Sequence, residues 1–325
     1  MSANSKQLNA VSNCIVCDTP GAESTRIRGE ELRAALGKYF GSAVPDEVSI
    51  RDYDLATCHA CGLGFSVPMI AGEGAFYSWI TRQAGYYPAF RWEWGIVLDR
   101  IRRMAANQTV SVLDVGCGSG DFLSMFGSIP GVDARGIDTT DSSVRAGRER
   151  GLNVVCADME QYKLENPEIW FDVVTSFHCI EHVGNPKAFL SQIVALLKPD
   201  RGVALVSAPL SPMSFETGWF DPLNHPPHHL TRWSLSALKE LSKSLGLESS
   251  ITTSPAGSNI VRALEALELE HQGALNSGRR RRQILGALSD VPGFLREYAV
   301  QSRRPKTGGR ALGNTFLAAF YHPRI

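Results

Sequence analysis

Short apolar runs alternate with amphipathic segments between residues 108 and 253. Continuous runs rich in Val, Ile and Leu suit strands that are buried on both faces of a sheet. Strands separated by helical segments are typical of βαβ units, so the pattern predicts an α/β fold with a doubly wound, mostly parallel sheet. The candidate strands are Val110–Val115, Ala134–Ile137, Val154–Ala157, Val173–Phe177 and Val203–Ala208, with a final strand in residues 314–321.

The part of the chain before this alternation falls into two zones. Residues 1–74 show little hydrophobic periodicity and predict a small N-terminal module held together by something other than a core. Residues 75–107 combine an aromatic stretch (86–94) with a helix expected over Ile96–Met104. This linker either packs its aromatic rings on the sheet or forms a lid over the site, with Arg91 or Glu93 facing inward.

The main domain is expected to cover residues 108–325, with a helical insertion at 254–307 before the final strand. The insertion is expected to form either a lid or the interface of a homo-oligomer. It contains four consecutive arginines (279–282), which we interpret as a solvated helix end or, alternatively, as a site for an anionic group of the substrate.

Composition excludes several classes of partner. The chain has 33 Lys plus Arg and 33 Asp plus Glu, so no overall field attracts nucleic acid, which is not the expected partner. The first thirteen residues are polar, and no run approaches the roughly 18 apolar residues of a membrane span. We therefore expect a cytoplasmic protein, whose seven cysteines are thiols or metal ligands rather than disulfides.

A glycine loop follows the first predicted strand, in VLDVGCGSG (112–120). Gly116, Gly118 and Gly120 allow a tight turn into a helix and let a ligand lie against bare backbone. A dinucleotide fingerprint needs its third glycine one position later, where this chain has Asp121. The acidic Asp114 before the loop suits a ligand that carries an ammonium group and no phosphate, as S-adenosylmethionine does.

Two further acids follow the next two strands. Asp138 ends the second strand, where a carboxylate can accept hydrogen bonds from both hydroxyls of a ribose, and Asp158 follows the third, where it can accept from the adenine amino group. Singly, each acid is as well explained as a helix cap or turn residue. Three acids in register after a glycine loop favour a nucleoside site.

These motifs resemble those of class I S-adenosylmethionine-dependent methyltransferases over about residues 108–253. The resemblance implies a Rossmann-like sheet of seven strands and S-adenosylmethionine as cofactor. It implies that Asp114 and the loop of Gly116, Gly118 and Gly120 bind the methionine end, that Asp138 binds the ribose, and that Asp158 and Met159 bind the adenine. We also place His178 among the cofactor-binding residues. The matching segments are DVGCGSG (114–120), GID (136–138), CADME (156–160), FDVVTSFHCIEHV (171–183), LLKPDRGVALVSAP (196–209) and HPPHHLTRWS (225–234).

Histidines gather in two segments that should border the same cleft. His178 and His182 follow the fourth strand, and His225, His228 and His229 follow the fifth. A methyl acceptor that holds its proton near neutral pH needs a base, and histidine is readily tuned to that role. The catalytic candidates are His182, His229 and His228, with His182 or His229 as proton acceptor; alternatively these side chains organise the loops or cap a helix.

Two CxxC motifs, Cys14–Cys17 and Cys58–Cys61, lie forty residues apart. Two such pairs complete a tetrahedral site of four thiolates, so the sequence predicts a structural Zn²⁺ bound by Cys14, Cys17, Cys58 and Cys61. A module with few core residues would depend on that metal for folding. The alternative is four unpaired thiols or a redox pair. The other three cysteines are expected to be small buried hydrophobic residues.

A zinc module before such a domain resembles bacterial methyltransferases of sugar and small-molecule pathways, among them sugar C-methyltransferases. The second C-terminal domain of that group is not expected here. We therefore expect methyl transfer to a small-molecule or glycosidic acceptor. The acceptor would belong to a sugar, nucleotide-sugar, polysaccharide or natural-product pathway. The alternatives are an RNA base methyltransferase, disfavoured by the zero net charge, and a non-catalytic cofactor-binding protein.

Overall fold

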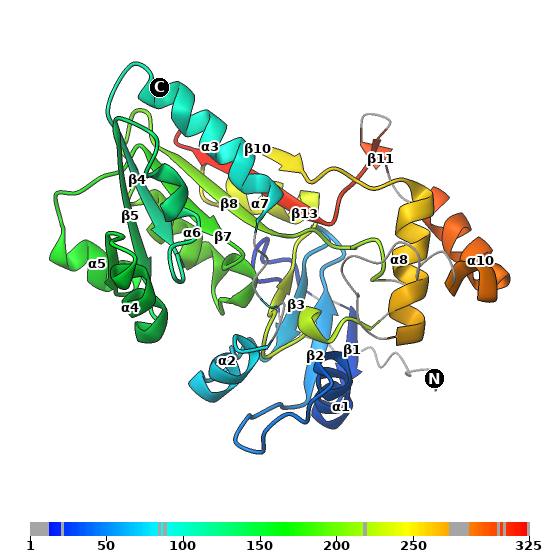
Figure 1. Cartoon of the computed structure of the whole chain (residues 1–325). Coiled ribbons are helices and arrows are strands. Elements are labelled where there is room, and N and C mark those ends of the chain that lie inside the picture. Colours follow the sequence, from blue (N-terminus) through cyan, green and yellow to red (C-terminus); the bar gives the residue numbers. More distant parts are fainter. Residues whose placement is uncertain are drawn as a thin grey trace.

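The computed structural model describes residues 13–20, 23–83, 86, 90–216, 220–272, 286–303, 306–307 and 310–323. Within these ranges a large sheet carries helices on its faces, and a smaller N-terminal sheet packs beside it (Figure 1). The pair of helices from the insertion, α8 and α10, lies at the far end of the molecule from α4 and α5 (Figure 1). Among the helices of these ranges, none has the length and apolar character needed to cross a membrane.

The large sheet has seven strands in the order β10-β13-β8-β7-β4-β5-β6. The five strands β8, β7, β4, β5 and β6 pair in parallel, whereas β13 is antiparallel to both β8 and β10. The doubly wound, mostly parallel seven-stranded sheet predicted from the sequence is thus confirmed. The strands are β4 (Val110–Val115), β5 (Val132–Asp138), β6 (Val154–Cys156), β7 (Val173–Phe177), β8 (Val203–Pro209), β10 (Glu248–Thr253) and β13 (Thr315–Tyr321).

Alternate residues of the central strands enter two separate cores, one on each face of the sheet. In β4, Leu113 and Val115 join the core under one set of helices, whereas Val110 and Val112 join the core on the other face. This follows from the period of two along a strand and explains why these strands are apolar throughout. The helices of the large sheet are α3 (Trp92–Ala105), α4 (Asp141–Glu149), α5 (Met159–Glu165), α6 (Pro186–Val194) and α7 (Leu235–Ser244).

Two local features of the large sheet differ from the expectation. The strand β10 was not among the candidates, because its sequence ESSITT is polar and it lies exposed at the sheet edge, where no burial demands apolar residues. The helix expected after the glycine loop is a short 3₁₀ turn, η1 (Leu123–Phe126). Two other 3₁₀ turns, η2 (Ile180–His182) and η3 (Pro222–Asn224), contribute to the site described below.

The N-terminal part forms a four-stranded sheet in the order β1-β2-β3-β9. The strand β9 (Thr231–Arg232) comes from the segment between β8 and α7, so this sheet joins the N-terminal part to the large-sheet domain. Leu32, Leu36 and Phe76 belong to a buried core here, so the expectation of a module without a core is wrong. The other elements are β1 (Glu23–Ile27), α1 (Gly29–Phe40), β2 (Tyr53–Thr57), β3 (Gly64–Val67) and α2 (Gly74–Ile80).

The insertion before the last strand is helical in its described part, as predicted. Its helices α8 (Asn259–Gln272) and α10 (Val291–Ser302) pack against each other, and a short hairpin of β11 (Lys306–Thr307) and β12 (Arg310–Ala311) follows. The arginine run at 279–282 lies outside the described residues.

Candidate functional site

The glycine loop leaves β4 at the carboxyl edge of the large sheet. Gly116, Gly118 and Gly120 all have positive φ angles, of 74°, 55° and 79°. A Cβ on Gly116 would clash with Cys179 Sγ, whereas one on Gly118 would meet no atom of the described residues within 4 Å. Gly116 is therefore required by close packing against the turn that follows β7. Gly118 presents bare backbone to open space, as a ligand-binding loop does.

Asp114 lies beneath this loop and is almost completely buried, with 3% of its surface exposed. Thr175 Oγ1, from the neighbouring strand β7, donates a hydrogen bond of 2.7 Å to Asp114 Oδ1. Burial raises the pKa of Asp114 to about 7, and the negative charge of Asp138 adds to this rise. A cation bound beside Asp114 would offset the cost of its buried charge.

Asp138, the last residue of β5, is held by backbone donors. The N–H groups of Gly118 and Thr140 each donate to its carboxylate at 2.8 Å. Asp158 caps α5, because its Oδ1 accepts from the N–H of Gln161 at 2.8 Å, and Met159 begins that helix. Asp158 thus has the helix-cap role that was the alternative to ligand binding. Its second oxygen, Oδ2, is not used by this cap.

His178 lies between two buried carboxylates just past β7. Its Nε2 is 3.0 Å from Glu93 Oε1 and its Nδ1 is 3.4 Å from Glu181 Oε1. Burial acts to lower the pKa of His178, but the hydrogen bonds to Glu181 and Glu93 outweigh it and raise the pKa. Glu93, in the first turn of α3, also accepts from Ser207 Oγ of β8, so its side chain faces the sheet.

The three predicted catalytic histidines are brought together. The ring centroid of His182, in η2, lies 4.6 Å from the ring centroid of His228 and 4.9 Å from that of His229. His228 and His229 stack on each other at 4.4 Å. Burial lowers the pKa of both well below its usual range, so they are neutral at pH 7.

Sequence reasoning did not single out Thr175 or Ser207 as members of this site, and it named Tyr86 only as part of the aromatic stretch expected to pack on the sheet or form a lid. Thr175 and Ser207 are completely buried, in strands whose other residues are mostly apolar, and that local contrast was the available signal. The hydroxyl of Tyr86 contacts His228 Nε2 at 2.9 Å, across 142 residues of chain, and no local pattern indicates such a contact.

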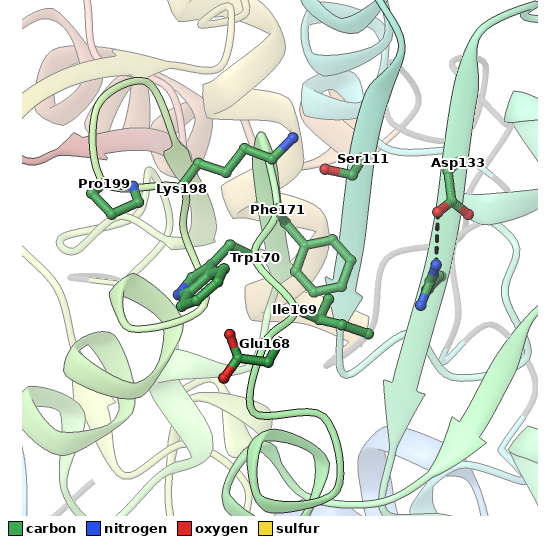
Figure 2. Close-up of a pocket in the computed structure, with 9 residues that line it drawn as sticks. Ser111, Asp133, Glu168, Ile169, Trp170, Phe171, Lys198 and Pro199 are labelled. Carbon is green, nitrogen blue, oxygen red and sulfur yellow. Dashed lines mark hydrogen bonds and ion pairs between the residues drawn. The ribbon is translucent and has the colours of Figure 1, made fainter.

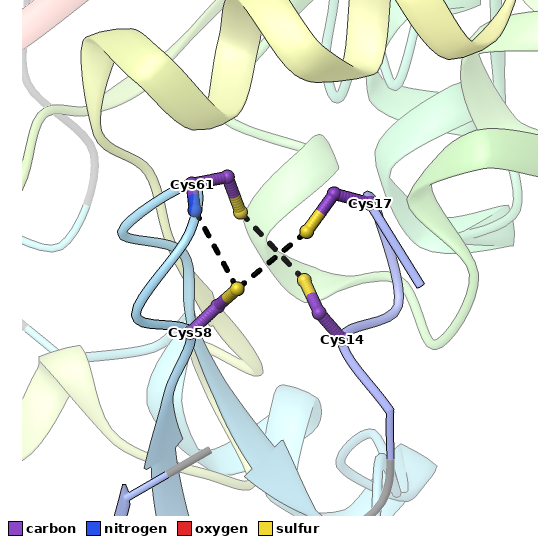
Figure 3. A group of neighbouring side chains, drawn as sticks. All are labelled: Cys14, Cys17, Cys58 and Cys61. Atoms are coloured by element: carbon purple, nitrogen blue, oxygen red, sulfur yellow. Dashed lines mark hydrogen bonds between the residues drawn. The ribbon is translucent and has the colours of Figure 1, made fainter. Parts of the chain in front are cut away.

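The four cysteines of the N-terminal part converge on one point (Figure 3). Cys14 Sγ lies 3.7 Å from Cys61 Sγ, and Cys17 Sγ lies 3.5 Å from Cys58 Sγ. Four thiolates around Zn²⁺, with bonds of about 2.3 Å, lie about 3.8 Å apart in a tetrahedron, so the observed spacing fits this ion. Gly62, with φ of 71°, turns the chain after the second pair.

A hollow of about 380 Å³ opens at the opposite end of the large sheet (Figure 2). Ser111 and Asp133, near the amino ends of β4 and β5, line it together with Trp170 and Lys198. Ligands of open α/β sheets bind at the carboxyl ends of the strands, so this hollow is not the cofactor crevice. Its polar groups serve the structure, since Lys198 Nζ lies 2.7 Å from the buried Asp172 carboxylate.

Comparison with known proteins agrees with this geometry. Residues 90–250 match the family model described as a methyltransferase domain. A ubiquinone biosynthesis O-methyltransferase of Bordetella parapertussis is 34% identical over 110 residues, which are 32% of this chain and 45% of that relative. A probable S-adenosylmethionine-dependent methyltransferase of Mycolicibacterium smegmatis is 29% identical over 200 residues, which are 61% of this chain and 71% of that relative.

Among solved structures, the plantazolicin methyltransferase BpumL in complex with a desmethyl analogue and S-adenosylhomocysteine is 17% identical, with a TM-score of 0.46, and covers 77% of this chain and 90% of its own. The first relative above is matched over less than half of its length. The strand order, the glycine loop and the family match together place residues 90–250 in one class. They form a methyltransferase domain of the class I, S-adenosylmethionine-dependent type.

Proposed function

We propose that this protein transfers a methyl group from S-adenosylmethionine to a small-molecule or glycosidic acceptor. The observation that carries the proposal is the meeting of three groups at one edge of the sheet. The open backbone at Gly118 and the Asp138 carboxylate lie on one side, and the histidine cluster follows β7 and β8 on the other. The name of the Bordetella relative concerns the synthesis of a small molecule, which agrees with this substrate class.

In this proposal the cofactor lies along the carboxyl ends of β4, β5 and β6. Asp114 and the glycine loop bind its methionine end, because a buried carboxylate gains from a neighbouring ammonium group. Asp138, fixed by two N–H donors, accepts from the ribose hydroxyls. Asp158 and Met159 bind the adenine, and His178 borders the cofactor from the end of β7. S-adenosylmethionine supplies a methyl group on a positively charged sulfur.

The acceptor binds on the side of His182, His228 and His229. Transfer from a sulfonium is an in-line displacement, so the protein must chiefly align the acceptor and exclude water. The contact of Cys179 with Gly116 places the start of η2 against the glycine loop, and His182 ends that turn. The three histidines are therefore suited to hold the acceptor atom that receives the methyl group.

The cysteine cluster holds a structural Zn²⁺ in this proposal. Support comes from the sulfur spacing and from the burial of Cys14, Cys58 and Cys61. Its role is to fix the N-terminal sheet against the methyltransferase domain. A cytoplasmic location and assembly into a homo-oligomer also belong to the proposal.

The test is transfer of a labelled methyl group from S-adenosylmethionine into fractionated extract of the source cell, with and without ribonuclease. We expect label in a small-molecule or sugar-containing fraction that ribonuclease does not affect. Label that ribonuclease removes would instead identify an RNA base methyltransferase. Absence of labelled product from any fraction, with cofactor binding intact, would favour the non-catalytic alternative.

A variant pair separates the two sides of the site. Asp138→Asn is expected to weaken binding of S-adenosylhomocysteine, whereas His182→Ala with His229→Ala is expected to keep that binding and to lose methyl transfer. Isothermal titration calorimetry measures the first property and the labelled assay the second. Loss of S-adenosylhomocysteine binding in the histidine variant would contradict the assignment of these histidines to the acceptor side of the site.

A further inference from the structure

The three clustered histidines share a hydrogen-bonding arrangement. In each ring, Nδ1 faces a carbonyl oxygen, which fixes the proton on that nitrogen. His182 Nδ1 donates to the carbonyl of His228 at 2.6 Å, and His228 Nδ1 donates to the carbonyl of Leu223 at 2.8 Å. His229 Nδ1 donates to Asn224 Oδ1 at 3.2 Å. Each Nε2 is therefore an acceptor, which in His228 accepts from the hydroxyl of Tyr86. Metal-binding histidines are oriented in the same way by partners of Nδ1.

The ring nitrogens are close enough for one ion. One nitrogen from each ring lies within 4.8 Å of one nitrogen from each of the other two. The centre of a triangle with such edges is about 2.8 Å from its corners. A bond of about 2.1 Å to Zn²⁺ thus needs each nitrogen to move inward by about 0.7 Å. The rings of His228 and His229, which are 18° from parallel, must also turn about their side-chain torsions so that both lone pairs face the ion.

The cluster is held in place by the backbone. The N–H of Leu230 donates to the carbonyl of Glu181 at 2.7 Å and so joins η2 to the segment that carries His228 and His229. The side chain of Glu181, beside His182, is 1% exposed. Neither of its oxygens has a hydrogen-bond partner of normal geometry in the described part of the chain, although it pairs with His178. A cation in the cluster would add to the stabilisation that His178 already gives this buried carboxylate.

We propose that His182, His228 and His229 bind a divalent transition-metal cation of the Zn²⁺ type through their Nε2 atoms. Three imidazoles are a ligand set that Zn²⁺ accepts, and they leave a fourth position open. The hydroxyl of Tyr86, at 2.9 Å from His228 Nε2, lies where it would move aside or contact the ion. This site is separate from the four cysteines.

The use of the ion in catalysis rests on the proposed function. An acceptor hydroxyl in the open position would lose its proton to solvent, because a metal lowers the pKa of a bound hydroxyl. Its oxygen would then form a bond to the methyl carbon while the carbon–sulfur bond breaks and its electrons return to sulfur. The products are the methyl ether and neutral S-adenosylhomocysteine, with one proton released.

The test counts metal in the whole protein and does not depend on methyl transfer. The purified chain is stripped with a chelator and titrated with Co²⁺, while the absorption spectrum and the metal-to-protein ratio are followed. We expect two equivalents. One gives the thiolate-to-cobalt charge-transfer band of the cysteine site, and the other adds only weak ligand-field bands.

The variant His182→Asn with His229→Asn is expected to bind the second equivalent more than tenfold more weakly and to keep the thiolate band, which also shows that the N-terminal sheet has folded. The control His322→Asn removes an exposed histidine and is expected to keep both equivalents. A wild-type chain that binds only one equivalent would overturn the proposal, and so would a double variant that keeps two. A chain that binds the second ion but methylates nothing would contradict the proposed function alone.

Discussion

At the scale of single residues, Asp114 is a buried carboxyl group at the position proposed to bind the cofactor. Its carboxyl group is buried beneath the glycine loop with one hydroxyl donor, from Thr175. Burial raises its pKa to about 7, compared with an ordinary value near 3.8. A ligand that brings an ammonium group would restore the charged form, so ligand binding and proton release are coupled at this residue.

We therefore predict that S-adenosylhomocysteine, which keeps the amino-acid end, binds more tightly as the pH rises from about 5.5 to 8. Below pH 7 the proton on Asp114 must leave before the carboxylate pairs with the ligand, which weakens binding by up to about tenfold per pH unit. Calorimetric titration at several pH values measures this. Asp114→Asn should bind weakly with a flat profile, and an unchanged slope in that variant would assign the pH dependence to another group.

The stability of the free protein depends on pH in the opposite direction to ligand binding. The folded pKa of Asp114 lies above its unfolded value, so its contribution to stability is fully present below about pH 4 and is lost as the pH rises through 7.

At the scale of elements, α7 connects the methyltransferase domain to the cysteine site. Ser234 caps this helix by accepting from the N–H of Ala237 at 3.0 Å, and its hydroxyl also donates to the carbonyl of Cys61 at 2.8 Å. Ser236 donates to the same carbonyl at 2.7 Å. The strand β9 directly precedes the helix and pairs with β3, so a cap, a strand pair and a cysteine turn stabilise one another.

Ser234→Ala should lower the free energy of unfolding by about 1 kcal/mol, because it removes the cap and one bond to the cysteine turn. Urea unfolding measures the effect as a lower midpoint without a change in slope. Ser244→Ala, at the other end of the same helix, removes only a bond to the carbonyl of Leu241 and is expected to change stability less. Equal effects of the two substitutions would contradict the special role of the cap.

At the scale of the whole molecule, the cysteine site and the large sheet share one core. Cys14, Cys58 and Cys61 belong to the same buried cluster as Leu113 and Trp233. The N-terminal sheet also takes its fourth strand from the segment after β8. A metal at this site therefore stabilises more than its own loops.

Removal of the proposed Zn²⁺ by a chelator should lower the unfolding temperature of the entire chain by about 10 °C, in a single transition. Differential scanning calorimetry with and without the chelator tests this. Adding Zn²⁺ back should restore the original transition. Two separate transitions, with the higher one unaffected by the chelator, would instead show that the cysteine site folds independently of the methyltransferase domain.

The sequence by itself determined the class of fold and the position of the glycine loop at the end of β4. The strands β4, β7 and β8 are apolar because both their faces are buried, and the positive φ angles of the loop after β4 favour glycine there. Such requirements act within a few residues and so remain visible in the sequence. The edge strand β10 is exposed, and its sequence therefore carried no comparable signal.

Only the tertiary structure decided which residues meet. The contact of Glu93 with His178 spans 85 residues, and that of Tyr86 with His228 spans 142. The pairing of β3 with β9, and the shared orientation of His182, His228 and His229, also depend on how distant segments pack. The physical reason is that side-chain contacts across a fold impose no periodicity or spacing on the chain that makes them.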